Sequence, residues 1–456
     1  MGTFDEYGNA ELGDKRLSER LIRLLEQLSS DPTASISAAC QDSHQAKAAY
    51  RFTGNENVTT EAIMKITQEV TMGNIFAAKP SVLLLPQDTT EINYTNLKAA
   101  EGMGNIGTRK TDMGIIVHSS MAISDEGMVY GLMAQKIWVR PPEEHGKSSN
   151  RSKLPIEEKE SYKWLETMEN AEVSFPDGTL VVHVCDREGD IYEFFCKAEK
   201  DGANYLCRRF HNRNVKSEDG GQKLDEFVNA LPEAGRITIS IPRDSHTGRV
   251  ARDAELEIKY GKCTILKSKN LVSSNDIPES VEVYVVSAVE IDPPPGQEKI
   301  CWQLVTNVPT YSFEEAVVRI QWYVQRWKIE IFHRTLKSGC KVEELQAETA
   351  DKLMKLIAIY SIIALHIMSI SYLARTQPDK SCEMCFTEDE WKLLYRAAKK
   401  TKKLPDKAPT ILEAVVMIAK LGGFLARNSD GFPGVTVIWR GLTKFYTIIE
   451  YAPFIA

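Results

Sequence analysis

The order of hydrophobic and polar positions predicts a helical module at the start of the chain. From Asp14 onward, leucines recur at helical spacing, which predicts a helix with one apolar side and Asp14 as its N-cap. A second helical piece covers 45–52 and ends in a polar turn at Gly54. In the first segment Arg16, Arg20 and Arg23 fall away from the apolar side, so a small basic helical module is expected. An ordinary amphipathic bundle would fit the composition equally well.

In the centre of the chain the pattern changes to strands. An apolar run at 81–86 has strand length, and two further strands begin near Gly114 and Met128, joined by a hairpin turn at 125–127. A helix at about 155–169, another buried strand and another helix follow. Three strands, a helix, a strand and a helix is the order of a ribonuclease-H-like core, so an α/β fold of this kind is predicted.

Short alternating segments between about 212 and 307 predict a β-rich insertion into that core. The stretch 321–337 contains neither Gly nor Pro and is predicted to be one helix, with Ile329, Phe332 and Leu336 on its core side. The expected organisation is therefore a helical domain at 1–70, the core with its insertion at 71–340, and a helical domain at 341–456.

After Lys337 two long helices are expected to run to Ala374. Their apolar part, Leu356 to Tyr372, is the one stretch with almost the length of a membrane span, but it carries His366 and three serines. We therefore expect a buried core helix and no membrane partner.

Composition and charge limit the class of protein. A hydrophobic content of 43% and a charged content of 26% are typical of a soluble globular protein, and 456 residues suggest about two or three domains. The first residues lack the apolar run of a secretory signal, so a cytoplasmic location is expected. The formal net charge of −7 argues against indiscriminate nucleic-acid binding, but it allows a local basic groove.

Three carboxylates are candidates for a catalytic site. Asp88 and Asp186 each directly follow a buried strand, where open sheets place functional groups, and Glu330 lies on a helix face with cations and aromatics. At about 100° per residue, Tyr323 and Arg326 fall on the same face as Glu330. Such a face suits a polyanion that also meets a metal. Turn-forming aspartates and a solvated helix with Arg–Glu pairs would explain the same spacing.

The spacing Tyr323-x-x-Arg326-x-x-x-Glu330-x-x-x-x-x-x-Lys337 resembles the signature of the insertion-sequence-four family of DDE transposases, whose best-known member is the Tn-five transposase. Further motifs agree with this resemblance. D-T-T at Asp88 and C-D-R-E-x-D at 185–190 match the family's first two catalytic aspartates. L-G-D-K-R-L and A-Y-R-F match its end-recognition domain, and L-G-G-F-L-A-R-N-S-D-G-x-P-G near the carboxy terminus matches its dimerisation domain.

The resemblance implies a cut-and-paste DNA transposase, acting as a homodimer on double-stranded transposon ends and target DNA in a bacterial, nucleoid-associated setting. Asp88, Asp186 and Glu330 would bind two Mg²⁺ ions per site, and Mn²⁺ would be accepted as well. The implied steps are nicking by water, attack of the freed 3′-OH on the opposite strand to form a hairpin, opening of the hairpin by water, and joining to target DNA.

The resemblance also implies DNA contacts. Trp302 matches the tryptophan that receives a flipped base in this family, although a core tryptophan would explain its presence equally well. The contact residues expected from the resemblance and the cation pattern are Tyr323, Arg326, Lys337, Arg334, Trp302, Arg187 and Arg208 in the core, and Arg16, Arg20 and Arg51 in the helical module.

Alternative functions share parts of this pattern. A metal-dependent nuclease of the ribonuclease H type would need the carboxylates alone, and an inactive transposase-derived DNA-binding protein would need none of them. The cationic surroundings of Glu330 argue against a two-carboxylate glycosidase. Nine scattered cysteines argue against a disulfide framework, and packing is expected for the single C-x-x-C of Cys382 and Cys385 rather than zinc or redox chemistry.

Overall fold

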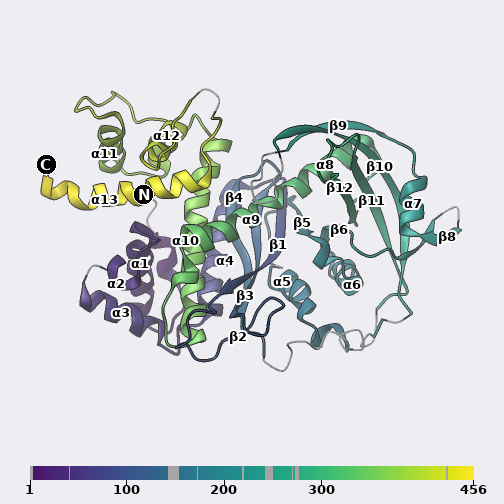
Figure 1. Cartoon of the computed structure of the whole chain (residues 1–456), viewed down its shortest axis with the longest axis horizontal. Helices are drawn as coiled ribbons and strands as arrows, with labels where there is room; N and C mark the ends of the chain where they lie inside the picture. Colours follow the sequence, from purple (N-terminus) through teal and green to yellow (C-terminus); the bar gives the residue numbers. More distant parts are fainter. Residues whose placement is uncertain are drawn as a thin grey trace. The chain divides into compact units, whose positions relative to one another are not determined.

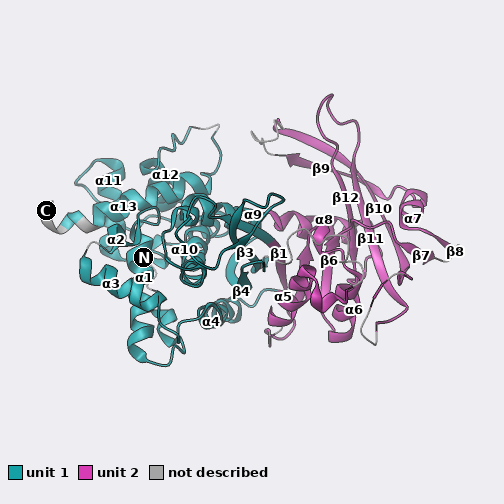
Figure 2. Cartoon of the chain, turned by 60° about the horizontal axis from the view of Figure 1, so that its bottom comes forward, with its two compact units in different colours: residues 1–80, 89–145, 328–456 teal, residues 81–88, 146–327 magenta. Residues whose placement is uncertain are grey.

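The computed structural model describes residues 4–40, 42–141, 154–171, 173–217, 220–241, 250–269, 271–272, 277–427 and 430–455. Two compact units share the chain (Figure 2): one holds 1–80, 89–145 and 328–456, and the other holds 81–88 and 146–327. Strand β1, Val82–Asn93, begins in the second unit and ends in the first. Residues 428–429 of the motif near the carboxy terminus lie outside the described residues.

The first unit joins both ends of the chain in one hydrophobic core. Side chains cap its early helices as the sequence predicts: Asp14 accepts a hydrogen bond from the backbone N–H of Arg16, and Asp42 from that of His44. Its helices and strands are η1 Phe4–Asn9, α1 Lys15–Ser30, α2 Ile36–Ala39, α3 Ser43–Thr53, α4 Thr60–Ala78, β2 Gly104–Asn105, β3 Met113–Ser124, β4 Val129–Trp138, α9 Trp327–Arg334, η7 Thr335–Gly339, η8 Val342–Glu344, α10 Ala350–Thr376, η9 Cys382–Met384, α11 Glu388–Lys399, α12 Ile411–Leu421 and α13 Val435–Ile455.

Helix α10 lies at the centre of this unit (Figure 1), where it packs against α1, α4, α12, α13 and β4. It is the one helix among the described residues that is long and apolar enough to cross a membrane. Most of its residues are nevertheless buried by the surrounding helices, which confirms the expected core helix. Helix α1 also contacts α13, so the two ends of the chain pack together.

The second unit is built on a mixed sheet. Its elements are the first half of β1, η4 Ile156–Glu158, η5 Glu160–Tyr162, α5 Lys163–Ala171, β5 Leu180–Cys185, η6 Arg187–Gly189, α6 Tyr192–Asp201, β6 Asn204–Arg208, β7 Asn214–Ser217, β8 Gly220–Lys223, α7 Leu224–Ala230, β9 Gly235–Ile241, β10 Arg252–Leu266, β11 Ser280–Glu290, β12 Cys301–Thr306 and α8 Phe313–Gln325. Strand side chains alternate between two cores, one beneath α5, α6 and α7 and the other beneath α8.

Hydrogen bonds order the strands β2-β3-β1-β5-β6-β12-β11-β10-β7-β8, with β4 beside β3 and β9 beside β10. β1, β5 and β6 are parallel, whereas β3 and β4 are antiparallel. The run β4-β3-β1-β5-β6 is the strand order of a ribonuclease-H-like fold, which confirms the predicted class. The β insertion is present as β7 to β12, and it includes the short helix α7, which the alternating pattern did not predict.

The predicted helix 321–337 is interrupted. α8 ends at Gln325, α9 covers Trp327–Arg334, and a π-helical turn covers Thr335–Gly339. A π turn takes in an extra residue, and this stretch has no Gly or Pro before 339 that would mark the change. A single long helix, α10, follows instead of the two that were expected, because a left-handed residue at Lys341 and a 3₁₀ turn intervene. Two 3₁₀ turns likewise replace the start of the helix expected at 155–169.

Candidate functional site

Two parallel strands of the second unit place Asp88 and Asp186 side by side. The register of β1 and β5 runs from Val82 beside Leu180 to Pro86 beside Val184, and each aspartate follows two residues after that last pair. Neighbouring strands lie about 4.8 Å apart, so the two residues lie beside each other in the centre of the sheet. The sequence predicted that each aspartate directly follows a strand; this is confirmed for Asp186, but it is wrong for Asp88, because β1 continues past that residue to Asn93.

Both aspartates belong to the face of the sheet that α8 covers. Side chains alternate along a strand, and Leu84 and Val182 contribute to the core beneath α8, so Asp88 and Asp186 share their face. Ser312 caps α8 by accepting a hydrogen bond from a backbone N–H, and the helix buries an apolar stripe against the sheet. This packing brings the carboxy-terminal end of α8 to the part of the sheet where the two carboxylates lie.

Arg326, at the end of α8, contacts Asp88. Its Nη1 lies 3.5 Å from Oδ2 of the carboxylate, and the two side chains are 13% and 18% exposed. Burial strengthens the attraction between the two charges, because few water molecules screen it. The contact holds the guanidinium beside Asp88, close to the position from which Asp186 emerges.

Tyr323 lies one turn before Arg326 and is almost fully buried. Burial raises the pKa of its phenol, and the neighbouring guanidinium groups of Arg326 and Arg208 partly oppose that shift. The ring of Trp302, on β12, packs edge-on against Tyr323 with 5.9 Å between ring centroids. Arg208 is held by a hydrogen bond of 3.0 Å from its Nη2 to the carbonyl of Cys301. Thus the aromatic and cationic residues expected from the sequence do meet.

The two aspartates in the segment after β5 have different roles. Asp186 accepts a hydrogen bond of 2.8 Å from the backbone N–H of Glu188 and so caps η6, while Arg187 points to solvent as an exposed residue. Asp190 is fully buried in an ion pair with Arg213. It also accepts the backbone N–H groups of residues 210 and 211 at 2.6 and 2.7 Å. Asp190 is therefore a structural residue, a role that the motif alone did not reveal.

Glu330, the third expected carboxylate, lies on α9 in the first unit. Ile329 and Phe332 are fully buried, which confirms the predicted core side of this helix, and Glu330 is half-buried. Within the described residues no group of three His, Cys, Asp or Glu side chains is placed to hold a metal ion. Because Asp88 and Asp186 belong to the second unit, the joint site of all three carboxylates stays a prediction.

The other expected contact residues of the core differ in their surroundings. Lys337, in the π-helical turn, lies 4.0 Å from Oε1 of Glu343, and Arg334 is exposed. Arg319, one turn before Tyr323 on α8, is buried. It donates to the carbonyl of Pro309 at 2.8 Å and stacks on Trp322 at 4.2 Å, so it stabilises the fold.

In the amino-terminal module, two of the three expected arginines are at the surface. Arg16 is exposed beside Asp14, at 2.9 Å, and Arg51 is exposed near the end of α3. Arg20 is half-buried and donates to the carbonyl of Gln45 at 2.9 Å, so its guanidinium connects α1 to α3. The helical pattern could not separate these cases, since all three arginines lie off the apolar stripe.

The cysteines have the character of packing residues. All nine are free, and burial raises the pKa of Cys382 to about 12 and that of Cys385 to about 11. Raised values keep both groups as thiols at neutral pH, whereas metal binding needs thiolates. The prediction of a packing role agrees with these surroundings.

Comparison with known proteins gives similarity at both ends of the chain. Residues 3–58 match the family model described as transposase DNA-binding, and residues 362–456 match the Transposase Tn5 dimerisation domain. Among solved structures, the cryo-EM structure of the piggyBac transposase synaptic complex with hairpin DNA is similar over 83% of this chain and 74% of that chain, at 12% identity and a TM-score of 0.37. That score is too low to support the fold, which therefore rests on the strand order.

Proposed function

We propose that the chain is a Tn5-like transposase, which excises a DNA element at its ends and joins the freed 3′ ends to target DNA. The observation that carries this proposal is the position of Asp88, within β1, beside Asp186, directly after the parallel neighbour β5, with Arg326 in contact with Asp88. Two neighbouring carboxylates with an adjacent guanidinium can bind a phosphodiester together with divalent cations.

Asp88 and Asp186 offer the oxygen ligands that Mg²⁺ and Mn²⁺ prefer, and we assign Glu330 as the third ligand. Two bound ions would supply an activated water and stabilise the leaving oxygen. Asp186 is already oriented by its bond to the N–H of Glu188, and Asp88 by Arg326, so both carboxylates are held before a substrate arrives. Such orientation lowers the entropic cost of assembling the site.

The residues around Tyr323 are suited to hold the DNA backbone. The guanidinium of Arg326 can form paired hydrogen bonds to a phosphate, and the neighbouring Arg208 adds a second positive charge. Lys337 and the exposed Arg334 and Arg187 would extend these contacts along the strand. Because Arg326 already touches Asp88, a phosphate bound to it would lie next to the carboxylates.

Trp302 would assist the formation of a hairpin. Sharp bending of the second strand toward the new 3′-OH requires a base to leave the stack. The indole of Trp302 is half-buried and held by Tyr323, so part of the ring is accessible to an extruded base. In this sequence of steps, water first nicks one strand, and the 3′-OH of the nicked strand attacks the opposite strand to form a hairpin. Water then opens the hairpin, and the same 3′-OH attacks target DNA.

The two matched domains would supply the partners. Exposed Arg16 and Arg51 are available for the ends of the element, whereas Arg20 would support the module from within. Pairing of two subunits would use the region that includes α12 and α13. The functional form would then be a homodimer bound to two double-stranded ends and to target DNA.

The test is an incubation of the purified chain and Mg²⁺ with DNA from both flanks of its gene, next to an Asp88→Asn variant. We expect nicked, hairpin and fully cleaved DNA in that order, followed by joining to a target plasmid, all absent with the variant. Cleavage without hairpins or joining would instead identify a metal-dependent nuclease. End binding without any cleavage would identify an inactive DNA-binding descendant.

A further inference from the structure

A pocket open to solvent lies on the side of the second unit's sheet that α6 covers, which is the face opposite to Asp88 and Asp186. Its volume is about 550 Å³, within the roughly 300–1,000 Å³ usual for binding sites. The lining comes from the η4 to η5 region, the start of α6, the segment after β6, the start of α7 and the end of β10.

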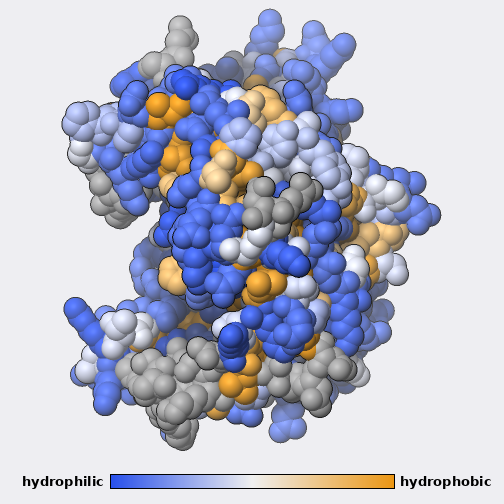
Figure 3. Space-filling view, turned by 90° about the vertical axis from the view of Figure 1, so that its right-hand side faces the viewer, coloured by the Kyte–Doolittle hydropathy of each residue, from blue (hydrophilic) through white to orange (hydrophobic). Residues whose placement is uncertain are grey.

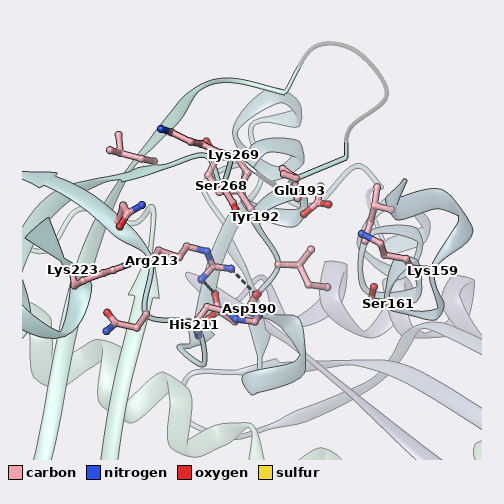
Figure 4. Close-up of a pocket in the computed structure, with 16 residues that line it drawn as sticks. Lys159, Ser161, Asp190, Tyr192, Glu193, His211, Arg213, Lys223, Ser268 and Lys269 are labelled. Carbon is pink, nitrogen blue, oxygen red and sulfur yellow. Dashed lines mark hydrogen bonds and ion pairs between the residues drawn. The ribbon is translucent and has the colours of Figure 1, made fainter. Parts of the chain in front are cut away.

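The floor of this pocket is fixed by internal bonds. Arg213 forms an ion pair with the buried Asp190 and donates from Nη2 to its backbone carbonyl at 2.7 Å (Figure 4). The side chain of Asn212 accepts the backbone N–H of Asp225 at 2.9 Å, which ties the same segment to α7. Tyr192 donates to the carbonyl of Pro278 at 2.9 Å. The pocket is therefore held in shape without a ligand.

Positive charge exceeds negative charge in the lining. Four cations, namely Lys159, Lys223, Lys269 and Arg213, stand against two carboxylates, Asp190 and Glu193, which leaves a net charge of +2. Arg213 and Asp190 neutralise each other, so the excess resides on the three lysines. Among the described residues none of these lysines forms an ion pair with a carboxylate. The chain as a whole carries −7, so this local excess stands out.

The lysines approach the pocket from different directions. Figure 4 shows Lys223 and Lys269 on one side and Lys159 on the other, with Arg213 and Asp190 between them. Ser161 and Asn214 add neutral hydrogen-bonding groups to the lining. Burial, with a contribution from Arg213, lowers the pKa of His211, so its imidazole is a neutral partner at pH 7.

We infer that this pocket is a second DNA site, in which Lys159, Lys223 and Lys269 bind backbone phosphates of a duplex outside the cleaved junction. Lys223 and Lys269 are exposed and Lys159 is half-buried. Lysines at an open rim are flexible point charges, which suit phosphates that reach the protein from outside. The face shown in Figure 3 is largely hydrophilic with separate apolar patches, which suits a polar ligand. The choice of DNA among phosphate ligands rests on the proposed function.

The experiment compares two triple variants of the full-length chain. The first, Lys159→Gln with Lys223→Gln and Lys269→Gln, removes the charges of the pocket. The second, Lys79→Gln with Lys98→Gln and Lys110→Gln, removes three exposed lysines of the other unit and so matches the change in net charge. Binding to a duplex that lacks the element's ends is followed by fluorescence anisotropy over a range of salt concentrations.

For the pocket variant, the slope of log K against log salt concentration should become less steep by about 2 to 3, since each lost phosphate contact contributes about 0.9. The control variant should keep the slope of the unmodified chain. Equal slopes for the pocket variant and the unmodified chain would overturn the inference, and unchanged cleavage of end DNA would then leave the proposed function standing. If the unmodified chain bound no DNA, the proposed function itself would fail.

A separate titration with adenosine triphosphate distinguishes the source of the phosphate. Heat of binding that is lost in the pocket variant, with duplex binding unchanged, would assign the pocket to a free nucleotide and overturn the assignment to DNA. Weakened duplex binding in the pocket variant, with no heat from the nucleotide, would support the DNA site. Circular dichroism and thermal unfolding should show that both triple variants are folded, because all six lysines lie outside the cores.

Discussion

Replacement of Trp302 separates a hairpin-forming transposase from a simple nuclease. Nicking of the first strand requires the carboxylates and a positioned phosphate, so Trp302→Ala should still nick. Hairpin formation requires an extruded base, which loses about 1–3 kcal/mol of stacking without the indole. That loss corresponds to a step roughly 5- to 150-fold slower. Nicked DNA should therefore accumulate, while ends supplied already cleaved should still be joined to target DNA.

The structure also gives the stability cost of this change. Trp302 lies on β12 opposite Ala288, packs edge-on against Tyr323 and is half-buried. Truncation of a fully buried tryptophan costs about 3–5 kcal/mol, so roughly half of that is expected here. Trp302→Phe keeps an aromatic face for stacking, so it should restore much of the hairpin rate.

The assay is a time course on an end-containing duplex, with products resolved on a denaturing gel and unfolding followed in parallel. The matched control is Trp138→Ala, which truncates another half-buried tryptophan, on β4. This variant should change the rates of nicking and of hairpin formation only slightly and to the same extent. Equal loss of nicking and hairpin in Trp302→Ala, in a protein that is still folded, would refute the reasoning. It would show that Trp302 acts only by supporting Tyr323.

Three further predictions follow from particular residues. Asp88→Asn, Asp186→Asn and Glu330→Gln should each slow cleavage more than about 100-fold, which exceeds the effect of replacing a residue that only supports a metal ligand. End binding should be retained, and the Asp186→Asn side chain can still cap η6. Near-normal cleavage by any one variant would remove that residue from the site. Tyr451→Asp, which charges an exposed ring on α13, should weaken formation of double-ended complexes on native gels while the melting temperature stays unchanged. Burial lowers the pKa of His366 to about 4. Stability should therefore be complete above about pH 6.5 and fall as pH drops toward 4, by up to roughly 3 kcal/mol; His366→Leu should flatten that dependence in urea titrations.

The sequence determined most of the strands of the core and the pairing of two carboxylates. Apolar runs of strand length followed by Asp88 and Asp186 are local signals, and the parallel pairing of β1 and β5 places those residues together. Helix caps such as Asp14 were equally readable, because a cap depends on residues within one turn. The ribonuclease-H-like strand order followed from the sequence of strands and helices, since few topologies fit that order.

The tertiary structure decided which charged residues serve the fold. Arg16 and Arg20 look alike in the helical pattern, yet Arg20 is bound to Gln45 and Arg16 remains at the surface. Asp186 and Asp190 stand four residues apart in one motif, but Asp190 is buried with Arg213, which lies 23 positions further along the chain. Periodicity reports which side of an element is buried; the partner that a buried charge meets depends on segments distant in sequence, and only the folded chain brings these together.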